Sequence, residues 1–202
     1  MSKGKLFIVS GPSGSGKDTI LQLVLEKHPE IKFSISTITR PKRNDAKEDG
    51  KYNFITKEEF LRMLDNDLLL EHNEYAGNYY GTPRIPVEEC INSGADMIVE
   101  VDVNGAANIR EKIPDAVSIF IMPPSLNELK RRLSKRGTES EDVVKLRLDA
   151  ALGEIARADE YDYIVVNDVL EEAVEDLLSV ILSERLKLSR QKYIIDEVLE
   201  KC

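Results

Sequence analysis

Short apolar runs alternate with amphipathic segments along most of the chain. The apolar runs have the length of buried strands and lie at residues 6–9, 97–102, 117–122 and 163–166. Segments with helical spacing of apolar residues follow them, at residues 17–27, 106–112, 126–135 and 169–201. Strands and helices that alternate in this way form a parallel sheet covered on both faces. The pattern predicts an α/β fold that binds its ligands at the carboxyl ends of the strands.

The stretch from Phe33 to Pro83 interrupts this alternation. Leu68–Leu70 and Tyr79–Tyr80 have the composition of strands. Thr56–Glu59 is a capping box, which begins a helix. We therefore expect a small mixed insertion here, and not a further strand–helix unit of the main sheet.

Further helices are expected in the second half of the chain. A second capping box, Ser125–Glu128, begins a helix that Gly137 ends, and Ser140 can cap the next one. The last helical pattern covers residues 169–201 and has a bend near Ser189. The pattern does not decide whether this last helix packs on its own core or on a partner.

Composition narrows the class of protein. The chain has 202 residues, enough for one domain with a proper core, and 42% of them are hydrophobic. Its net charge of −9 disfavours a broad surface for nucleic acid or for an anionic membrane. No apolar run reaches membrane-spanning length. Cys90 and Cys202 lack metal-ligand spacing, so we expect a reducing, cytoplasmic location. The sequence allows a homo-oligomer without deciding for one.

A glycine-rich loop, GPSGSGKDT, joins the first strand to the first helix at residues 11–19. Glycines let backbone N–H groups approach a ligand, and the following helix adds its positive dipole end. Lys17 would reach the terminal phosphates of a nucleotide. The alternative is an ordinary glycine turn, but the strand–loop–Lys–helix context favours a phosphate site of the P-loop type.

Asp18 departs from the usual P-loop pattern, which has Ser or Thr at this position to bind magnesium. A carboxylate is also an oxygen ligand for Mg2+. Alternatively, Asp18 only stabilises the start of the helix by its negative charge. Both interpretations stay open from the sequence, and Asp18 is the candidate metal ligand.

A second anion site is suggested by Arg40 and Arg43, which lie three residues apart around Pro41. Two guanidinium groups can bind one phosphate from two sides. Tyr52 and Tyr80 could add hydroxyl donors. The alternative is a solvated basic surface with two half-buried strand tyrosines.

Glu71 follows three leucines and precedes the turn that ends at Thr82. A carboxylate at the end of an apolar strand needs a partner. Guanine offers paired donors at N1–H and N2–H₂, and Ser36 or Thr82 could donate to its O6. Adenine would leave such groups unpaired, so this pattern indicates a guanine site.

Five cations lie within residues 130–136 of this acidic chain, and Arg147 follows on the next helix. They form either a solubilising face or a lid whose arginines neutralise a transferring phosphoryl group. Asp102 ends an apolar strand as a Walker-B acid does, and Glu100 lies on the same strand face.

With these residues in view, the sequence resembles the guanylate kinase family along nearly its whole length. The pair Tyr52 and Phe54 is part of the resemblance, and the turn GNYYG downstream of a strand glutamate is specific to this family among nucleoside monophosphate kinases. The other shared motifs are GPSGSGK, FSIST, EHNEYAGNYYGTP, VDVNGA, IFIMPPS, KRGTES and EYDYIVVND.

The resemblance implies a single domain of residues 1–202, with its core at 1–33, 84–128 and 158–202. It further implies a GMP-binding insertion at 34–83 and a lid at 129–157. The implied reaction is in-line transfer of a phosphoryl group from ATP to GMP or dGMP, with Mg2+.

The resemblance also assigns roles to residues. Those that would bind GMP are Ser36, Arg40, Arg43, Tyr52, Glu71, Tyr80, Thr82, Glu100 and Asp102. Those that would bind ATP are Ser13, Gly14, Ser15, Gly16, Lys17, Asp18, Thr19, Arg132 and Asn167. Those that would stabilise the transferring group are Lys17, Arg43, Arg136 and Arg147.

Three alternatives remain at this stage. A related P-loop kinase acts on ribose 1,5-bisphosphate and tends to carry Asp after the P-loop Lys, which Asp18 matches but Glu71 does not explain. A guanylate-kinase-like interaction module generally loses the phosphate loop, which is intact here. A GTPase would carry an Asn-Lys-x-Asp motif, and this sequence has none.

Overall fold

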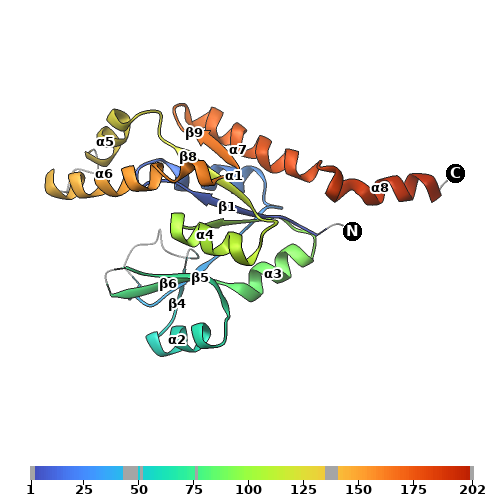
Figure 1. Cartoon of the computed structure of the whole chain (residues 1–202), viewed down its shortest axis with the longest axis horizontal. Coiled ribbons are helices and arrows are strands. Elements are labelled where there is room, and N and C mark those ends of the chain that lie inside the picture. Colours follow the sequence, from blue (N-terminus) through green and yellow to red (C-terminus); the bar gives the residue numbers. More distant parts are fainter. Residues whose placement is uncertain (1–2, 43–49, 51, 76, 135–140, 201–202) are drawn as a thin grey trace.

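The computed structural model describes residues 3–42, 50, 52–75, 77–134 and 141–200. In this part of the chain the strands form two sheets (Figure 1). The larger sheet has the order β2-β7-β1-β8-β9 and every neighbouring pair is parallel. Its strands are β1 (Leu6–Ser10), β2 (Lys32–Phe33), β7 (Met97–Glu100), β8 (Val117–Met122) and β9 (Tyr163–Val166).

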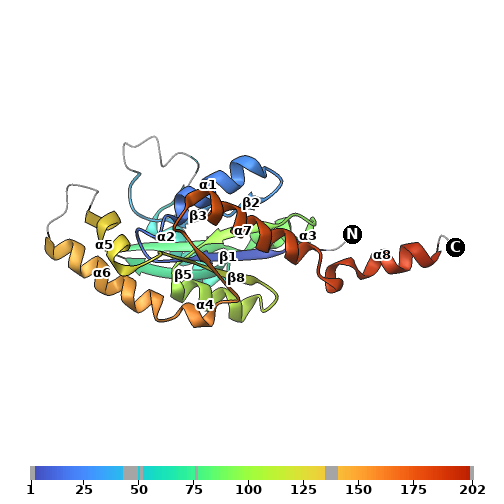
Figure 2. The ribbon, with the colours of Figure 1, turned by 90° about the horizontal axis from the view of Figure 1, so that it is seen from above.

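Helices cover both faces of the larger sheet because its central strand, β1, has apolar side chains on both faces and is buried along its whole length. In β1, Phe7 and Val9 pack with α1 (Lys17–Lys27) and α7 (Leu170–Arg185). Leu6 and Ile8 point the opposite way, toward α3 (Arg84–Asn92) and α4 (Val103–Lys112). Figure 2 shows α1 and α7 on one side of the sheet and α4 on the other. This confirms the predicted α/β fold with a covered parallel sheet.

The smaller sheet has the order β4-β3-β6-β5 and carries the expected mixed insertion. Its strands are β3 (Ser36–Ile38), β4 (Tyr52–Phe54), β5 (Leu69–Tyr75) and β6 (Asn78–Pro83). β3 pairs with β4 in parallel, whereas β6 is antiparallel to both β3 and β5. The register of β5 shifts between Leu69 and Glu71, as at a β-bulge.

Helix α2 (Lys57–Asp65) packs on the smaller sheet and begins at the predicted capping box. The Thr56 hydroxyl accepts from the Glu59 N–H at 3.1 Å, and the Glu59 carboxylate accepts from the Thr56 N–H at 2.9 Å. At the second predicted box, Ser125 accepts from the Glu128 N–H at 3.1 Å. The Glu128 carboxylate binds arginines of its own helix.

Helices α5 (Leu126–Ser134) and α6 (Glu141–Ile155) form a separate layer beside the end of the larger sheet (Figure 1). They pack together through Leu129, Leu133, Val144 and Ala151. A single 3-10 turn, Ala158–Glu160, leads from α6 to β9. No helix in the described residues is both long and apolar enough to cross a bilayer.

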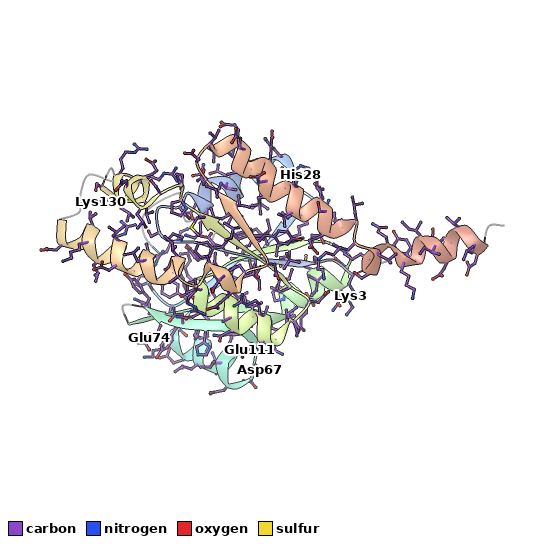
Figure 3. The ribbon with its side chains drawn as sticks, turned by 45° about the horizontal axis from the view of Figure 1, so that its top comes forward. Lys3, His28, Asp67, Glu74, Glu111 and Lys130 are labelled. Atoms are coloured by element: carbon purple, nitrogen blue, oxygen red, sulfur yellow. The ribbon has the colours of Figure 1, made fainter. Side chains whose placement is uncertain are left out.

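Two boundaries differ from the sequence expectation. The strand expected to end at Asp102 ends at Glu100, because Asp102 caps α4. The C-terminal helical stretch is divided at residues 186–187 into α7 and α8 (Leu188–Glu200), two residues before the expected bend. Charged side chains are spread over the surface, as the exposed Glu74, Glu111 and Lys130 illustrate (Figure 3).

Candidate active site

The loop between β1 and α1 has the backbone conformation of an anion-binding loop. Gly14 and Gly16 have φ angles of 88° and 90°, in the left-handed region that favours glycine. Gly16 is the N-cap of α1, and no side chain caps this helix start. Its first N–H groups are therefore available to an anion at the positive end of the helix dipole. A Cβ at Gly16 would lie 2.2 Å from Asn167 Nδ2, so the position needs glycine on steric grounds as well.

Lys17 lies beside the carboxylate of Glu100 at the start of α1. Its ammonium is 3.6 Å from Glu100 Oε1, and the two side chains are only 20% and 27% exposed. Burial raises the pKa of Glu100, Lys17 opposes this rise, and Asp18 adds to it by its charge and by hydrogen bonding. One cation thus balances a closely spaced pair of acids beside the phosphate loop. Such a pair also provides oxygen ligands for a cation.

Arg132 and Asn167 hold the phosphate loop from the outside. Asn167 Nδ2 donates to the Ser15 carbonyl at 2.7 Å, and Arg132 Nη1 donates to the same oxygen at 3.3 Å. Arg132 Nη2 also donates to the Asn167 carbonyl at 2.9 Å. Hydrogen bonds from Arg131 and Arg132 lower the pKa of Glu128 to about 2. Part of the basic cluster therefore has a structural role, since it fixes the backbone of the loop.

Helix α6 also reaches the phosphate loop. Arg147 Nη2 donates to Ser13 Oγ at 2.5 Å. Near the end of the same helix, burial raises the pKa of Glu154, with Lys17 opposing and Asp102 adding to the rise. Glu154 thus lies within electrostatic range of Lys17 and Asp102, and the sequence did not predict this. It belongs to no motif, and only the packing of α6 brings it here.

The predicted guanine-reading residues meet on the smaller sheet. Glu71 on β5 is 7% exposed and lies in register with Thr82 on β6. The Thr82 hydroxyl donates to Glu71 Oε1 at 2.7 Å. Burial raises the pKa of Glu71 to about 7; Thr82 opposes this rise, and the charge of Asp102 adds to it. A Cβ on Gly105 would lie 3.0 Å from Glu71 Oε2, so α4 packs closely against this carboxylate.

Asp102 uses both carboxylate oxygens within the protein. Its Oδ1 accepts from the N–H groups of Asn104 and Gly105 at 3.0 and 2.8 Å, which caps α4. Its Oδ2 accepts from Asn73 Nδ2 at 2.7 Å. Asp102 therefore connects β5 of the smaller sheet to the start of α4. Neither Asn73 nor this link was expected from the sequence.

The expected phosphate-binding residues lie on neighbouring strands of the smaller sheet. Ser36 and Tyr52 are in register on β3 and β4, and Tyr80 on β6 is in register with Ile38. The Arg40 guanidinium lies 5.7 Å from the ring centre of Tyr52. Ser36, Tyr52 and Tyr80 are partly buried, and Thr19 is exposed on α1. Arg43 and Arg136 lie outside the described residues.

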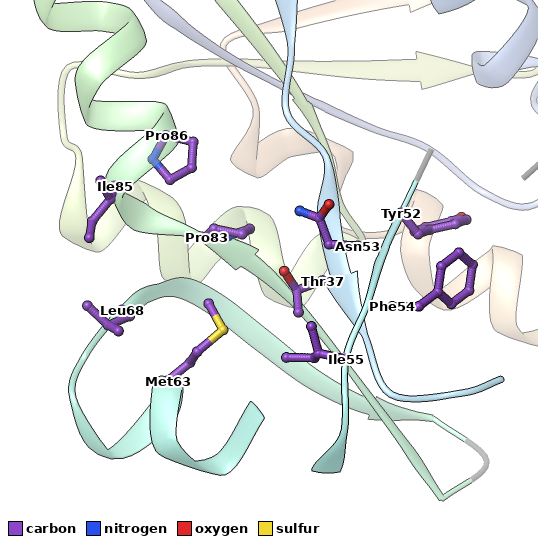
Figure 4. Close-up of a pocket in the computed structure, with 10 residues that line it drawn as sticks. All are labelled: Thr37, Tyr52, Asn53, Phe54, Ile55, Met63, Leu68, Pro83, Ile85 and Pro86. Atoms are coloured by element: carbon purple, nitrogen blue, oxygen red, sulfur yellow. The ribbon is translucent and has the colours of Figure 1, made fainter. Parts of the chain in front are cut away.

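A separate apolar cavity of about 690 Å³ lies on the smaller sheet. Figure 4 shows Met63, Leu68 and Ile55 on one side of β4, with Tyr52 and Phe54 on the other. The charged residues of the phosphate loop do not line this cavity. Among the described residues that line the cavity, Tyr52 is the only expected GMP-binding residue.

Comparison with known proteins decides the family. The family model described as guanylate kinase matches residues 3–184. The chain belongs to the guanylate kinase family. A guanylate kinase from Desulfitobacterium hafniense is 44% identical over 195 residues, which cover 96% of this chain and 98% of that protein. One from Yersinia pestis is 44% identical over 203 residues, which cover 100% of this chain and 98% of that protein.

Solved structures agree with this family assignment. A crystal structure of a guanylate kinase from Anaplasma phagocytophilum superposes with a TM-score of 0.76 at 34% identity, covering 94% of this chain and 90% of that one. A shikimate kinase from Bacteroides thetaiotaomicron shares the fold at a TM-score of 0.51 and 15% identity, covering 88% of this chain and 98% of that one. Guanylate kinase motifs thus occur here within the fold of a P-loop kinase.

Proposed function

We propose that this chain transfers the terminal phosphoryl group of ATP to GMP or dGMP. The observation that carries the proposal is the buried Glu71–Thr82 pair on the smaller sheet, in a chain that also has an intact phosphate loop with Lys17. The Glu71–Thr82 pair would offer a carboxylate to the donor edge of guanine, and the phosphate loop would bind the phosphates of ATP. Membership of the guanylate kinase family supports the same reaction.

The proposed site works by positioning and charge. The protein must align donor and acceptor, exclude water and balance the negative charge that spreads over the transferring group. Lys17 is proposed to supply charge from the loop, and Arg147 from α6. Arg43 and Arg136 have the same proposed role by their sequence positions. No side chain needs to act as a nucleophile.

Guanine selection is proposed to rest on Glu71. Its ionised carboxylate would accept from guanine N1–H and N2–H₂, while Thr82 orients it by the hydrogen bond at 2.7 Å. Arg40, Tyr52 and Tyr80 would hold the phosphate of GMP, and Ser36 would contact the base. Asp102 already accepts hydrogen bonds from Asn73 and from the backbone of α4. It would therefore affect GMP binding indirectly, by raising the pKa of Glu71 and by fixing the position of β5.

The acids beside Lys17 fit a magnesium ion. Within the described residues, no three His, Cys, Asp or Glu side chains are grouped so that they could hold a metal together. Magnesium needs only one or two carboxylates when phosphates and waters complete its shell. Asp18 would hold the ion, with Glu100 beside it. An ion held by Asp18 would supply positive charge against the negative charge of the ATP phosphates.

The proposed organisation follows the two sheets and the helical layer. Residues 34–83 would bind GMP, and residues 129–157 would form the lid over ATP. We propose a cytoplasmic enzyme, which the free thiol of Cys90 supports because a reducing compartment preserves it.

The test is a coupled assay of ADP formation from ATP and magnesium. GMP and dGMP should stimulate ADP formation. For AMP, kcat/KM should be lower than for GMP by on the order of 10²-fold or more, because AMP leaves polar groups of the guanine site unpaired. Lys17→Met is the inactive control. Equal use of AMP and GMP would refute the Glu71 site, and stimulation by ribose 1,5-bisphosphate alone would replace the proposed substrate.

A further inference from the structure

Strand β5 lies along helix α4 and is attached to this helix on both sides of Glu71 (Figure 1). Before Glu71, Lys112 Nζ at the end of α4 donates to the Leu69 carbonyl at 2.9 Å. After Glu71, Asn73 Nδ2 donates at 2.7 Å to Oδ2 of Asp102, the N-cap of α4. The distance of the Glu71 carboxylate from the larger sheet therefore depends on these two attachments.

The two attachments do not hold Glu71 equally well. The register of β5 shifts between Leu69 and Glu71, and a strand can bend at such a bulge. The bond from Lys112 lies on the far side of this bulge from Glu71. Asn73 is two residues from Glu71 in the regular part of the strand, so both side chains lie on the same face. The bond of Asn73 therefore fixes Glu71 more directly.

The acceptor of this bond is itself held in place. Asp102 uses Oδ1 to accept from the N–H groups of Asn104 and Gly105 at 3.0 and 2.8 Å, so its side chain is fixed to the start of α4. Its Oδ2 is the atom that accepts from Asn73. Asn73 thus ties the smaller sheet to a fixed point beside the larger one.

The space around the Glu71 carboxylate is narrow. A Cβ on Gly105 would lie 3.0 Å from Glu71 Oε2, and the Thr82 hydroxyl donates to Oε1 at 2.7 Å. Thr82 belongs to β6, which would move together with β5. Gly105 belongs to α4, which would not. A shift of β5 away from α4 would therefore keep the Glu71–Thr82 pair but change its position relative to the phosphate loop.

We propose that Asn73 is a positioning residue for GMP. Its bond to Asp102 holds β5 against α4 before the nucleotide binds, and so keeps Glu71 where guanine would meet it. Because it concerns the GMP site, this role rests on the proposed function. When only a fraction of the molecules has the binding arrangement, the apparent affinity falls by that fraction. Loss of the Asn73 bond should therefore weaken GMP binding and leave transfer in the bound complex nearly unchanged.

Calorimetric titration with GMP and steady-state kinetics, both at constant pH, test this role. Asn73→Ala should raise the Kd and the KM for GMP by about fivefold, the effect of one hydrogen bond. The kcat and the KM for ATP should stay within about twofold of their normal values. Asn73→Asp should weaken GMP binding further, because it places a second carboxylate against Asp102.

The double variant Asn73→Asp/Asp102→Asn is the decisive measurement. It exchanges donor and acceptor, because the new amide at position 102 can donate to the new carboxylate at position 73. An amide at position 102 also keeps an oxygen for the cap of α4, and the pair keeps one negative charge near Glu71. The double variant should therefore bind GMP more tightly than Asn73→Asp and close to normally.

Asn92→Ala is the matched control, because it makes the same chemical change at an exposed site of α3 and should bind GMP normally. An unchanged Kd for GMP in Asn73→Ala, a loss of kcat without a change in Kd, or a double variant that binds no better than Asn73→Asp would each overturn the role of Asn73. These outcomes leave the proposed function intact if the unmodified chain phosphorylates GMP. An unmodified chain that does not bind GMP would instead overturn both.

Discussion

At the scale of single residues, Glu71 has a charge state that depends on what it binds. It is 7% exposed, and burial raises its pKa to about 7. In the nucleotide-free protein the carboxyl therefore keeps its proton up to about neutral pH. In the proposed complex guanine would present two donors to Glu71, and only the ionised carboxylate would accept from both. Binding of GMP should thus be linked to loss of this proton.

We expect GMP to bind about tenfold more tightly at pH 8 than at pH 6, because the ionised fraction of Glu71 rises about tenfold between them. The free energy of unfolding depends on pH in the opposite direction. The stabilisation that Glu71 contributes to the folded protein is fully present below about pH 4.5 and is lost as the pH rises through about 7. Calorimetric titration with GMP at both pH values measures the effect.

Glu71→Gln is the matched control for this prediction, because it keeps the shape and cannot titrate. It should bind GMP more weakly, and what remains of its pH dependence comes from the phosphate of GMP. An equal pH dependence in the unmodified chain and in Glu71→Gln would contradict the role of Glu71.

Asp18 is the second residue with a specific prediction. Asp18 raises the pKa of Glu100, so its carboxylate lies near that of Glu100, which is 3.6 Å from the Lys17 ammonium beside the phosphate loop. Asp18→Ala should raise the magnesium concentration for half-maximal rate by about tenfold, as for loss of a metal ligand. Asp18→Ser should recover most of the activity, since a hydroxyl is the usual ligand there. A magnesium titration of Asp18→Ala identical to that of the unmodified chain would leave only stabilisation of the helix start.

At the scale of elements, the N-termini of two helices, α1 and α4, organise the candidate site. The start of α1 has no side-chain cap and is open to an anion, whereas Asp102 caps α4 and also accepts from Asn73 on β5. The two helix starts follow neighbouring strands of the larger sheet, β1 and β7. The start of α1 is therefore available for the proposed phosphate, and the start of α4 is connected to the smaller sheet through Asp102.

Removing the α4 cap should destabilise the protein even without nucleotides. Asp102→Ala should lower the free energy of unfolding by about 1–3 kcal/mol, because it leaves two backbone N–H groups and Asn73 without their acceptor. Asp102→Asn keeps an oxygen for the cap and should lose less. Urea unfolding measures both variants. Equal stability of Asp102→Ala and the unmodified chain would show that the cap does not stabilise the fold.

At the scale of the whole molecule, three layers meet around the phosphate loop. The larger sheet supplies the loop, the smaller sheet supplies Glu71, and α6 reaches over with Arg147 to Ser13. The hydrogen bond from Asn73 to Asp102 links two of these layers, and Arg147 links the third. In the proposed reaction, all three would have to be in place together.

Arg147→Ala should therefore lower kcat by about tenfold or more while changing the KM for GMP much less, because its charge acts mainly in the assembled state. Lys145→Ala removes the same charge from an exposed site of the same helix and should be close to normal. Steady-state kinetics with both substrates separate the two variants. A similar kcat in both would remove Arg147 from the transfer step.

The sequence by itself predicted the features that depend on neighbours in the chain. Apolar runs and helical spacing predicted the alternating elements, and the Thr56–Glu59 box predicted where α2 begins. The phosphate loop was predictable because nine consecutive residues carry its whole geometry. Glu71 could be singled out because a carboxylate in an apolar run must find a partner.

Only the tertiary structure decided the features that depend on strand order and helix packing. Asn73 meets Asp102 because β5 lies beside α4, and Asn167 reaches Ser15 across 152 positions of sequence. Glu154 approaches Lys17 only because α6 packs as it does. The direction of α8 is set by Asp96 and Lys3, which are remote in sequence. Local pattern carries no information on such pairs, because the contacts that select them form only when distant segments pack together.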